Sequence, residues 1–215
     1  MKKIIWLLPL AVLLASCEFA SDINMIEGEG EVITEDRYVG EFTKVESQIA
    51  ADVEIIESDE PGIVISAQKN LLPYLDTDVR RGTLEISFGD YSVETDSTIA
   101  ITIFTPSLEE FSLTGVGNID SQLPLNSIIL TGVGNIVAHG ATENVNVRIT
   151  GSGNVDLYDM PVEIAEISIT GVGNVKVFVS NLLDVSISGM GNVYYKGTPT
   201  IYSSITGIGQ VVDSN

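Results

Sequence analysis

From Leu113 onward, apolar and polar positions recur in step with one short phrase, Thr-Gly-x-Gly-Asn, which occurs six times with small variations. Its first glycines are 17, 19, 20, 18 and 18 residues apart. A β-branched residue follows the amide in every copy, and a Leu or Ile stands five positions before it. A unit of this length holds a strand, a turn and a return, so each copy predicts one rung of a β-solenoid. The repeated glycines and amides are Gly115, Gly117, Asn118, Gly132, Gly134, Asn135, Gly151, Gly153, Asn154, Gly171, Gly173, Asn174, Gly189, Gly191, Asn192, Gly207, Gly209 and Gln210.

The paired glycines allow two interpretations. Flanking a single residue, they permit positive φ or a close approach of the backbone to the neighbouring rung, as a corner between sheets demands. An amide at such a corner can bond to the next rung and form a ladder. Alternatively, strict alternation continues through the phrase, so that Thr, the middle residue and Asn form an outward stripe. We favour the corner, and the sequence leaves open whether the ladder faces inward or outward.

The preceding part, 37–110, predicts an irregular series of short strands, with period-two or continuous β-branched runs separated by turns. Pro73 excludes a central strand at Leu71–Leu75, which we interpret as an edge, a loop or a short turn. Together with the rungs, this part forms one all-β domain, 37–215. The main predicted strands surround Val53–Ile55, Ile63–Ile65, Leu84–Phe88 and Ile99–Ile103.

Residues 1–17 have the pattern of a targeting segment. Lys2 and Lys3 precede an apolar stretch that is too short to span a bilayer. Leu14-Ala15-Ser16-Cys17 then resembles the bacterial lipobox, and Cys17 is the only cysteine. An ordinary secretory signal is the alternative, but the cysteine's place at the end of the apolar run favours lipid attachment at Cys17. We expect membrane contact through this anchor only.

The segment 18–36 is acidic and contains Gly28 and Gly30, which predicts a flexible tether. Acidic residues soon after the lipidated cysteine are similar to the surface-export signals of Bacteroidetes lipoproteins. We therefore expect an outer-membrane lipoprotein, at the cell surface rather than on the periplasmic face.

The charge balance excludes one class of partner. The chain has 30 acidic and 10 basic residues, for a formal net charge of −20. Removal of a leader containing Lys2 and Lys3 would leave 8 basic residues and a net charge of −22. Such a field repels phosphate backbones, so we expect no nucleic-acid binding.

Candidate catalytic and metal-binding groups are sparse. His139 is the only histidine, so a zinc site or a histidine-based triad lacks partners. Glycine-rich nonapeptide coils bind calcium through an aspartate, but a neutral amide occupies that position here. We expect no metal and no cofactor. Asp156 with Asp159, or Glu163 with Glu166, could form an acid–base pair for glycoside cleavage, but solvated surface carboxylates are the simpler interpretation. We expect no enzymatic activity.

A file of residues four positions after the amide includes His139, Tyr158 and Phe178, with Tyr194 nearby. Facing outward, these side chains would form a strip on which sugars could stack. We favour the alternative, in which the file turns inward at a second corner and packs. Two positions after the amide, Asp156 and Lys176 are expected to be neighbours on the outer face.

The last phrase lies close to Asn215, so the final rung is expected to have an open edge unless residues 211–215 cover it or another chain pairs with it, and self-association through this end is a hypothesis. Gln210 departs from the Asn pattern and suggests a frayed or capping rung.

The repeated Ser/Thr-Gly-x-Gly-Asn, with Phe42, Val45, the Leu71-Leu72 region and Gly82–Ile86, resembles the putative auto-transporter adhesin, head GIN domain family. The resemblance covers about residues 37–215. It implies a right-handed β-helix-like solenoid on a secreted or lipid-anchored protein, and it transfers no catalytic residues.

Three functions follow as hypotheses. The leading one is a non-enzymatic envelope module that contacts glycans or other envelope proteins through its repetitive faces. The second is a structural or self-assembling spacer without a ligand, and the third is a carbohydrate-active enzyme.

Overall fold

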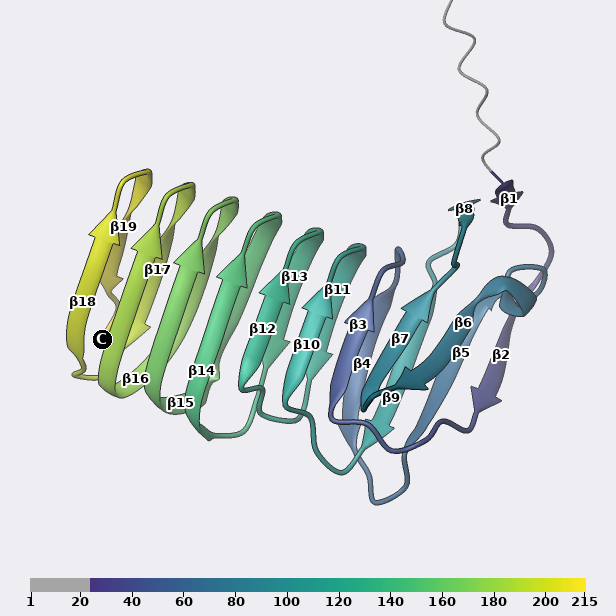
Figure 1. Cartoon of the computed structure of the whole chain (residues 1–215), viewed down its shortest axis with the longest axis horizontal. Coiled ribbons are helices and arrows are strands. Elements are labelled where there is room, and N and C mark those ends of the chain that lie inside the picture. The colour runs from purple at the N-terminus through teal and green to yellow at the C-terminus, as the bar shows by residue number, and fades with distance from the viewer. Residues whose placement is uncertain (1–23) are drawn as a thin grey trace, which may run out of the picture.

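The computed structural model describes residues 24–215, and this part of the chain is all-β. It forms the expected right-handed β-helix-like solenoid (Figure 1). Cys17, the leader and residues 18–23 lie outside the described residues. The elements are β1 (Asn24–Glu27), β2 (Val32–Arg37), β3 (Lys44–Ser47), β4 (Asp52–Glu57), β5 (Gly62–Gln68), η1 (Leu72–Tyr74), β6 (Asp76–Arg80), β7 (Thr83–Ser87), β8 (Tyr91–Glu94), β9 (Ala100–Thr105), β10 (Glu110–Leu113), β11 (Val116–Ser121), β12 (Ser127–Leu130), β13 (Val133–Ala138), β14 (Thr142–Ile149), β15 (Ser152–Ile169), β16 (Val172–Ile187), β17 (Met190–Lys196), β18 (Thr200–Ile205) and β19 (Ile208–Asp213).

Two files of parallel strands build the solenoid. The first file contains β7, β3, β10, β12, β14, the second halves of β15 and β16, and β18. The second contains β9, β4, β11, β13, the first halves of β15 and β16, β17 and β19. The repeat phrases lie where the chain turns from the first file to the second, along the upper edge of Figure 1. Equivalent residues of successive rungs are therefore direct neighbours.

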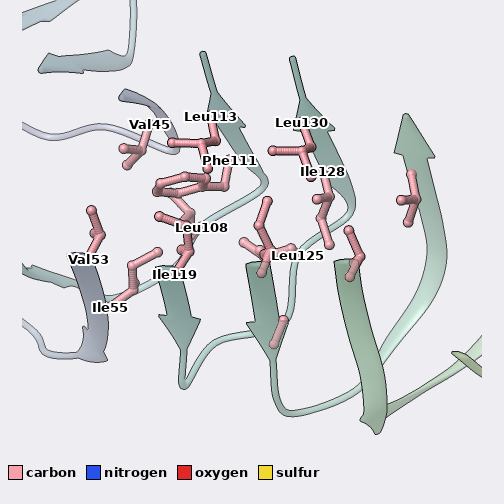
Figure 2. Close-up of a cluster of buried hydrophobic side chains, with 14 of the residues drawn as sticks. Val45, Val53, Ile55, Leu108, Phe111, Leu113, Ile119, Leu125, Ile128 and Leu130 are labelled. Atoms are coloured by element: carbon pink, nitrogen blue, oxygen red, sulfur yellow. The ribbon is translucent and has the colours of Figure 1, made fainter. Parts of the chain in front are cut away.

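The hydrophobic core lies between the two files. Leu113 and Leu130 from the first file and Ile119 and Ile136 from the second are at most 1% exposed. Figure 2 shows side chains of both files pointing toward one another across this space. The predicted apolar columns are confirmed up to the last rung, where Ile205 is 40% exposed. Alternation along each strand thus puts every second side chain into a continuous aliphatic interior.

The N-terminal half closes one end of the solenoid with mixed pairing. β3 and β4 pair in parallel with β7 and β9 on one side and with β10 and β11 on the other. Beyond β7 and β9 the pairing becomes antiparallel, through β6 in the first file and through β5 and then β2 in the second. The rung formed by β3 and β4 therefore lies between strands that all follow it in the sequence.

The prediction of a flexible tether over 18–36 is wrong for its described residues. β1 pairs with β8, and β2 pairs with β5 over six residues. Ile26 and Ile33 pack against the core, and Arg37 forms an ion pair with Glu35 at 2.6 Å between Nε and Oε1. Acidic composition suggested a mobile segment, but a strand at the end of a sheet needs only one apolar face and a paired backbone.

The leucine-rich segment Leu71–Leu75 contains the single turn η1, in agreement with one of the predicted alternatives. Leu71, Leu72 and Leu75 are buried in the core. The guanidinium of Arg37 donates a hydrogen bond from Nη2 to the carbonyl oxygen of Leu72 at 2.7 Å. Arg37 therefore joins β2 to the segment that carries these leucines.

We expect Arg37→Ala to lower the free energy of unfolding by about 2 kcal/mol, because hydrogen bonds from a charged donor are lost at a partly buried position. Denaturant unfolding measures the change. The exposed Lys69→Ala is the control and should stay within about 0.5 kcal/mol of wild type. Equal effects of the two substitutions would show that β2 is not held through Arg37.

Candidate functional site

The six repeat phrases form one continuous corner of the solenoid. In each phrase the hydroxyl residue, the middle residue and the amide residue are exposed or half-buried, whereas the residues on either side of the phrase are buried in the first five copies. We call these three exposed columns the corner array. It consists of Thr114, Thr131, Thr150, Thr170, Ser188 and Thr206; of Val116, Val133, Ser152, Val172, Met190 and Ile208; and of Asn118, Asn135, Asn154, Asn174, Asn192 and Gln210.

Each of the two interpretations of the phrase describes part of the corner. The first file ends at Leu113 and the second begins at Val116, so the chain does turn at Thr114-Gly115. At the same time, exposed and less exposed residues continue to alternate through the phrase. The amides consequently face outward.

The corner glycines are required by the backbone of the neighbouring rung. A Cβ atom added at Gly171 would lie 2.0 Å from the carbonyl oxygen of Gly151, and one added at Gly173 would lie 1.8 Å from that of Gly153. The other copies show the same approach of about 2 Å. Such contacts are far inside van der Waals separation, so the stacked corners exclude every side chain at both positions.

The outward amides form the predicted ladder. The Nδ2 of each asparagine from Asn135 to Asn192 donates to the Oδ1 of the asparagine one rung earlier, at 2.9 to 3.2 Å. The Oδ1 of Asn154 also accepts the backbone N–H of Asn174, and the Oδ1 of Asn192 accepts that of Gln210. The ladder therefore connects side chains with the backbone across all six rungs.

A seventh corner, at Gln48–Asp52, precedes the six phrases and was missed in the sequence. Ala50 pairs with Val116, and the Oδ1 of Asp52 accepts hydrogen bonds from the backbone N–H and the Nδ2 of Asn118 at 2.9 and 3.0 Å. Asp52 thus begins the ladder. In the sequence, only the polar Asp52 just before Val53 indicates this corner, because the two glycines of the phrase are absent.

The seventh corner tolerates side chains because no second tight corner stacks beneath it: β7 ends at Ser87, β9 begins at Ala100, and a longer excursion that carries β8 connects them. Ile49 occupies the place of the first glycine and is buried. Beside it lies a cavity of about 210 Å³, lined by Ile49, Phe88, Tyr91 and Val93 among others. Where the next turn does not stack closely, a Cβ atom fits.

The aromatic strip faces outward, so the favoured prediction of inward packing is wrong. Phe178 is 39% exposed, and Tyr158, His139 and Tyr194 are half-buried on the outer face of the second file. They do not form a continuous platform. The Nζ of Lys196 lies 4.2 Å from the ring centroid of Tyr158. Two of the other rings have different neighbours: the Nε2 of His139 lies 3.3 Å from the Oδ1 of Asp120, and Phe178 lines a groove with Pro161 and Val162.

The predicted pair of Asp156 and Lys176 is confirmed, with Nζ and Oδ2 2.7 Å apart. The hydrogen bond and the charge of Asp156 raise the pKa of Lys176. Lys176 also lies 5.7 Å from the ring of Tyr158. Asp156 is therefore engaged with a surface cation.

The final rung differs from the others at its inward positions. Ser203 occupies the position that is equivalent to the buried Val185 of the preceding rung, and Asp213 occupies the position that is equivalent to Tyr195. Hydrogen bonds from the backbone and side chain of Asn215 lower the pKa of Asp213. Polar residues that point inward protect an exposed edge against pairing. The capping interpretation of Gln210 agrees with this rung, and self-association through it stays a prediction.

Among residues 24–215, no three His, Cys, Asp or Glu side chains gather as a metal site would require. In the same range, no helix has the length and apolar character needed to cross a bilayer.

The fold and the corner place the protein in the class of β-solenoids built from stacked parallel strands. The model of the family described as "Putative auto-transporter adhesin, head GIN domain" matches residues 41–130 and 127–199. The chain belongs to this family. No curated protein matches the chain.

Several solved structures share the fold. The chain is similar to a putative adhesin from Bacteroides fragilis, with 24% identity, a TM-score of 0.66, and coverage of 88% of this chain and 100% of that one. A putative adhesin from Parabacteroides merdae has 20% identity and a TM-score of 0.58, with coverage of 89% and 100%. A putative lipid binding protein from Parabacteroides distasonis has 23% identity and a TM-score of 0.50, again with coverage of 89% and 100%.

We expect Gly171→Ala to destabilise the protein by about 3 kcal/mol or more, because its Cβ atom would force two rungs apart. Thermal and denaturant unfolding measure the loss. Gly40→Ala is the matched control, since no atom lies within 4 Å of a Cβ added there. If both variants unfold like wild type, the stacked corners are looser than described.

Proposed function

We propose that the chain is a non-enzymatic binding module of the cell envelope, and that the corner array is its contact surface. One observation carries the proposal. The middle residue of the phrase is a large apolar residue in five of six copies, although four of these side chains are 47 to 52% exposed and Ile208 is 73% exposed. Ser152 occupies the same position without altering the corner, so the fold does not require an apolar residue there. A row of exposed apolar side chains is typical of interaction surfaces.

The proposal includes a lipid on Cys17 and display at the cell surface. The leader supports the anchor, and the membership in an adhesin-like family supports an envelope location. β1 lies at the end of the solenoid opposite β19 (Figure 1). An anchor that precedes β1 would direct the six rungs, and with them the corner array, away from the membrane.

A role without catalysis agrees with the surface chemistry. Lys176 engages Asp156, and Asp120 contacts His139. General acid–base catalysis needs groups with perturbed pKa values that converge on one substrate position. The pairs considered in the sequence, Asp156 with Asp159 and Glu163 with Glu166, lie on the solvated exterior.

A structural spacer is the second candidate, and the continuous ladder and core favour it. Both features make the six rungs a stiff unit that could hold another part of the envelope at a fixed distance. Such a spacer would not need the apolar column of the corner array. The two functions therefore differ in the expected effect of substitutions at that column.

Labelling of intact cells tests the proposed function. With an epitope tag after Asn215, cells should bind an impermeant antibody without lysis and should attach to neighbouring cells or to isolated envelopes. In Cys17→Ala cells, both signals should fall to background, because the protein is no longer anchored. Labelling only after the outer membrane is opened would contradict surface display. Surface labelling without any attachment would favour the spacer.

A further inference from the structure

The corner array repeats the same chemistry in each rung, and this regularity points to a ligand with a regular repeat. We propose that the corner array binds a single extended, uncharged glycan chain along the solenoid axis. The inference rests on the proposed function and identifies its partner. It depends on four properties of the array: its apolar column, its hydrogen-bond donors, its lack of charge and its size.

The apolar column forms a ridge between two polar columns. Val116, Val133, Val172 and Met190 are all about half exposed, and neighbouring rungs are spaced about 4.8 Å apart. A sugar ring has a C–H face and a rim of hydroxyl groups. The apolar ridge can pack against the C–H faces of successive sugar rings. The hydroxyl and amide columns on either side of it can form hydrogen bonds with the hydroxyl groups at the rims of these rings.

The amide column offers donors rather than acceptors. The Oδ1 atoms of Asn154 and Asn174 each accept two hydrogen bonds within the ladder, from the Nδ2 and the backbone N–H of the next rung. An amide nitrogen has two N–H groups, and the ladder uses one of them. The column therefore presents one further N–H per rung to a partner rich in acceptor oxygens, as hydroxyl, ring and N-acetyl oxygens are.

The charge distribution of the protein favours binding of an uncharged polymer over binding of an acidic one. The six phrases contain no charged residue, in a chain with a net charge of −20. An acidic polysaccharide would be repelled by the surrounding field and would meet no cation within the array. A neutral polymer meets neither obstacle.

The uniformity of the rungs argues against a peptide ligand. A peptide presents different side chains along its length and alternates N–H and C=O groups along its edge. Equivalent rungs cannot distinguish such positions from one another. A polymer of identical units, in contrast, makes the same contacts in every rung and gains from their number.

Size argues against a second copy of the chain. Six rungs about 4.8 Å apart, each crossed in four residue steps of about 3.3 Å, outline a strip of roughly 350 Å². A stable protein interface buries about 800 Å² on each partner. The array is thus too narrow for a stable dimer, but it has the shape of one polymer chain.

Affinity electrophoresis of the full chain carrying Cys17→Ala tests the inference. The probes are soluble β-glucan, xylan and galactomannan, with polygalacturonate as the acidic polymer. We expect at least one neutral polysaccharide to retard the protein and polygalacturonate to leave it unaffected. Val133→Glu with Val172→Glu should weaken binding at least about fivefold, because two apolar contacts are lost and charge is added.

Two further variants sharpen the test. Ile129→Glu with Ser168→Glu places the same charges on the outer face of the first file in the same two rungs, and it should bind within twofold of wild type. Ser152→Val fills the gap in the apolar ridge and should strengthen binding about threefold. Circular dichroism verifies that each variant is folded.

The outcomes separate the glycan assignment from the proposed function. Equal weakening by both double variants, or preferential binding of polygalacturonate, overturns the assignment. Failure to bind any polysaccharide also overturns it. If cells displaying Val133→Glu with Val172→Glu then lose attachment, the corner remains the contact surface and the function stands. If sedimentation shows a wild-type dimer that this variant abolishes, a second copy is the partner instead.

Discussion

Close stacking of the backbone at one corner is the constraint on which the rest of the structure depends. Carbonyl oxygens occupy the space in which the next rung would place its Cβ atoms, as at Gly151 and Gly171. Glycine alone permits this approach. Because the corners stack without offset, the strands on both sides remain in register, and the aliphatic side chains of successive rungs meet in continuous columns.

The same stacking determines what the outside of the corner can present. The side chains of each phrase that are neither glycine nor core must point to solvent, and each lies directly above its counterpart in the previous rung. Asn118 and Asn135 can then bond to one another without any adjustment of the backbone. The surface is consequently as regular as the core, and its chemistry depends on one residue choice repeated in every rung.

Sequence and structure agree where a position must satisfy the same geometry in every rung. Six equivalent phrases made the rungs, the apolar columns and the amide ladder predictable. The corner at Gln48–Asp52 was not predictable from the repeat because the chain beneath it passes through β8 instead of a tight corner, so Ile49 needs no glycine in its place. The strand β2 was not predicted because its acidic composition indicated a flexible segment, whereas its pairing with β5 in the folded chain makes it a strand. The outward position of Tyr158 was not predicted, because the alternation of inward and outward residues continues through the buried Leu157 to Tyr158 before the register of β15 shifts.

Asp52 gives the amide ladder an electrical direction. Every side-chain N–H in the ladder points toward the preceding rung, so the amide dipoles are aligned along the solenoid with their positive ends toward the N-terminal half. Aligned amides polarise one another. The carboxylate of Asp52 meets the positive end of this row, as an acidic residue does at the start of an α-helix. A β-solenoid can in this way acquire a macrodipole from its side chains, although the peptide dipoles of its strands alternate along the axis and nearly cancel.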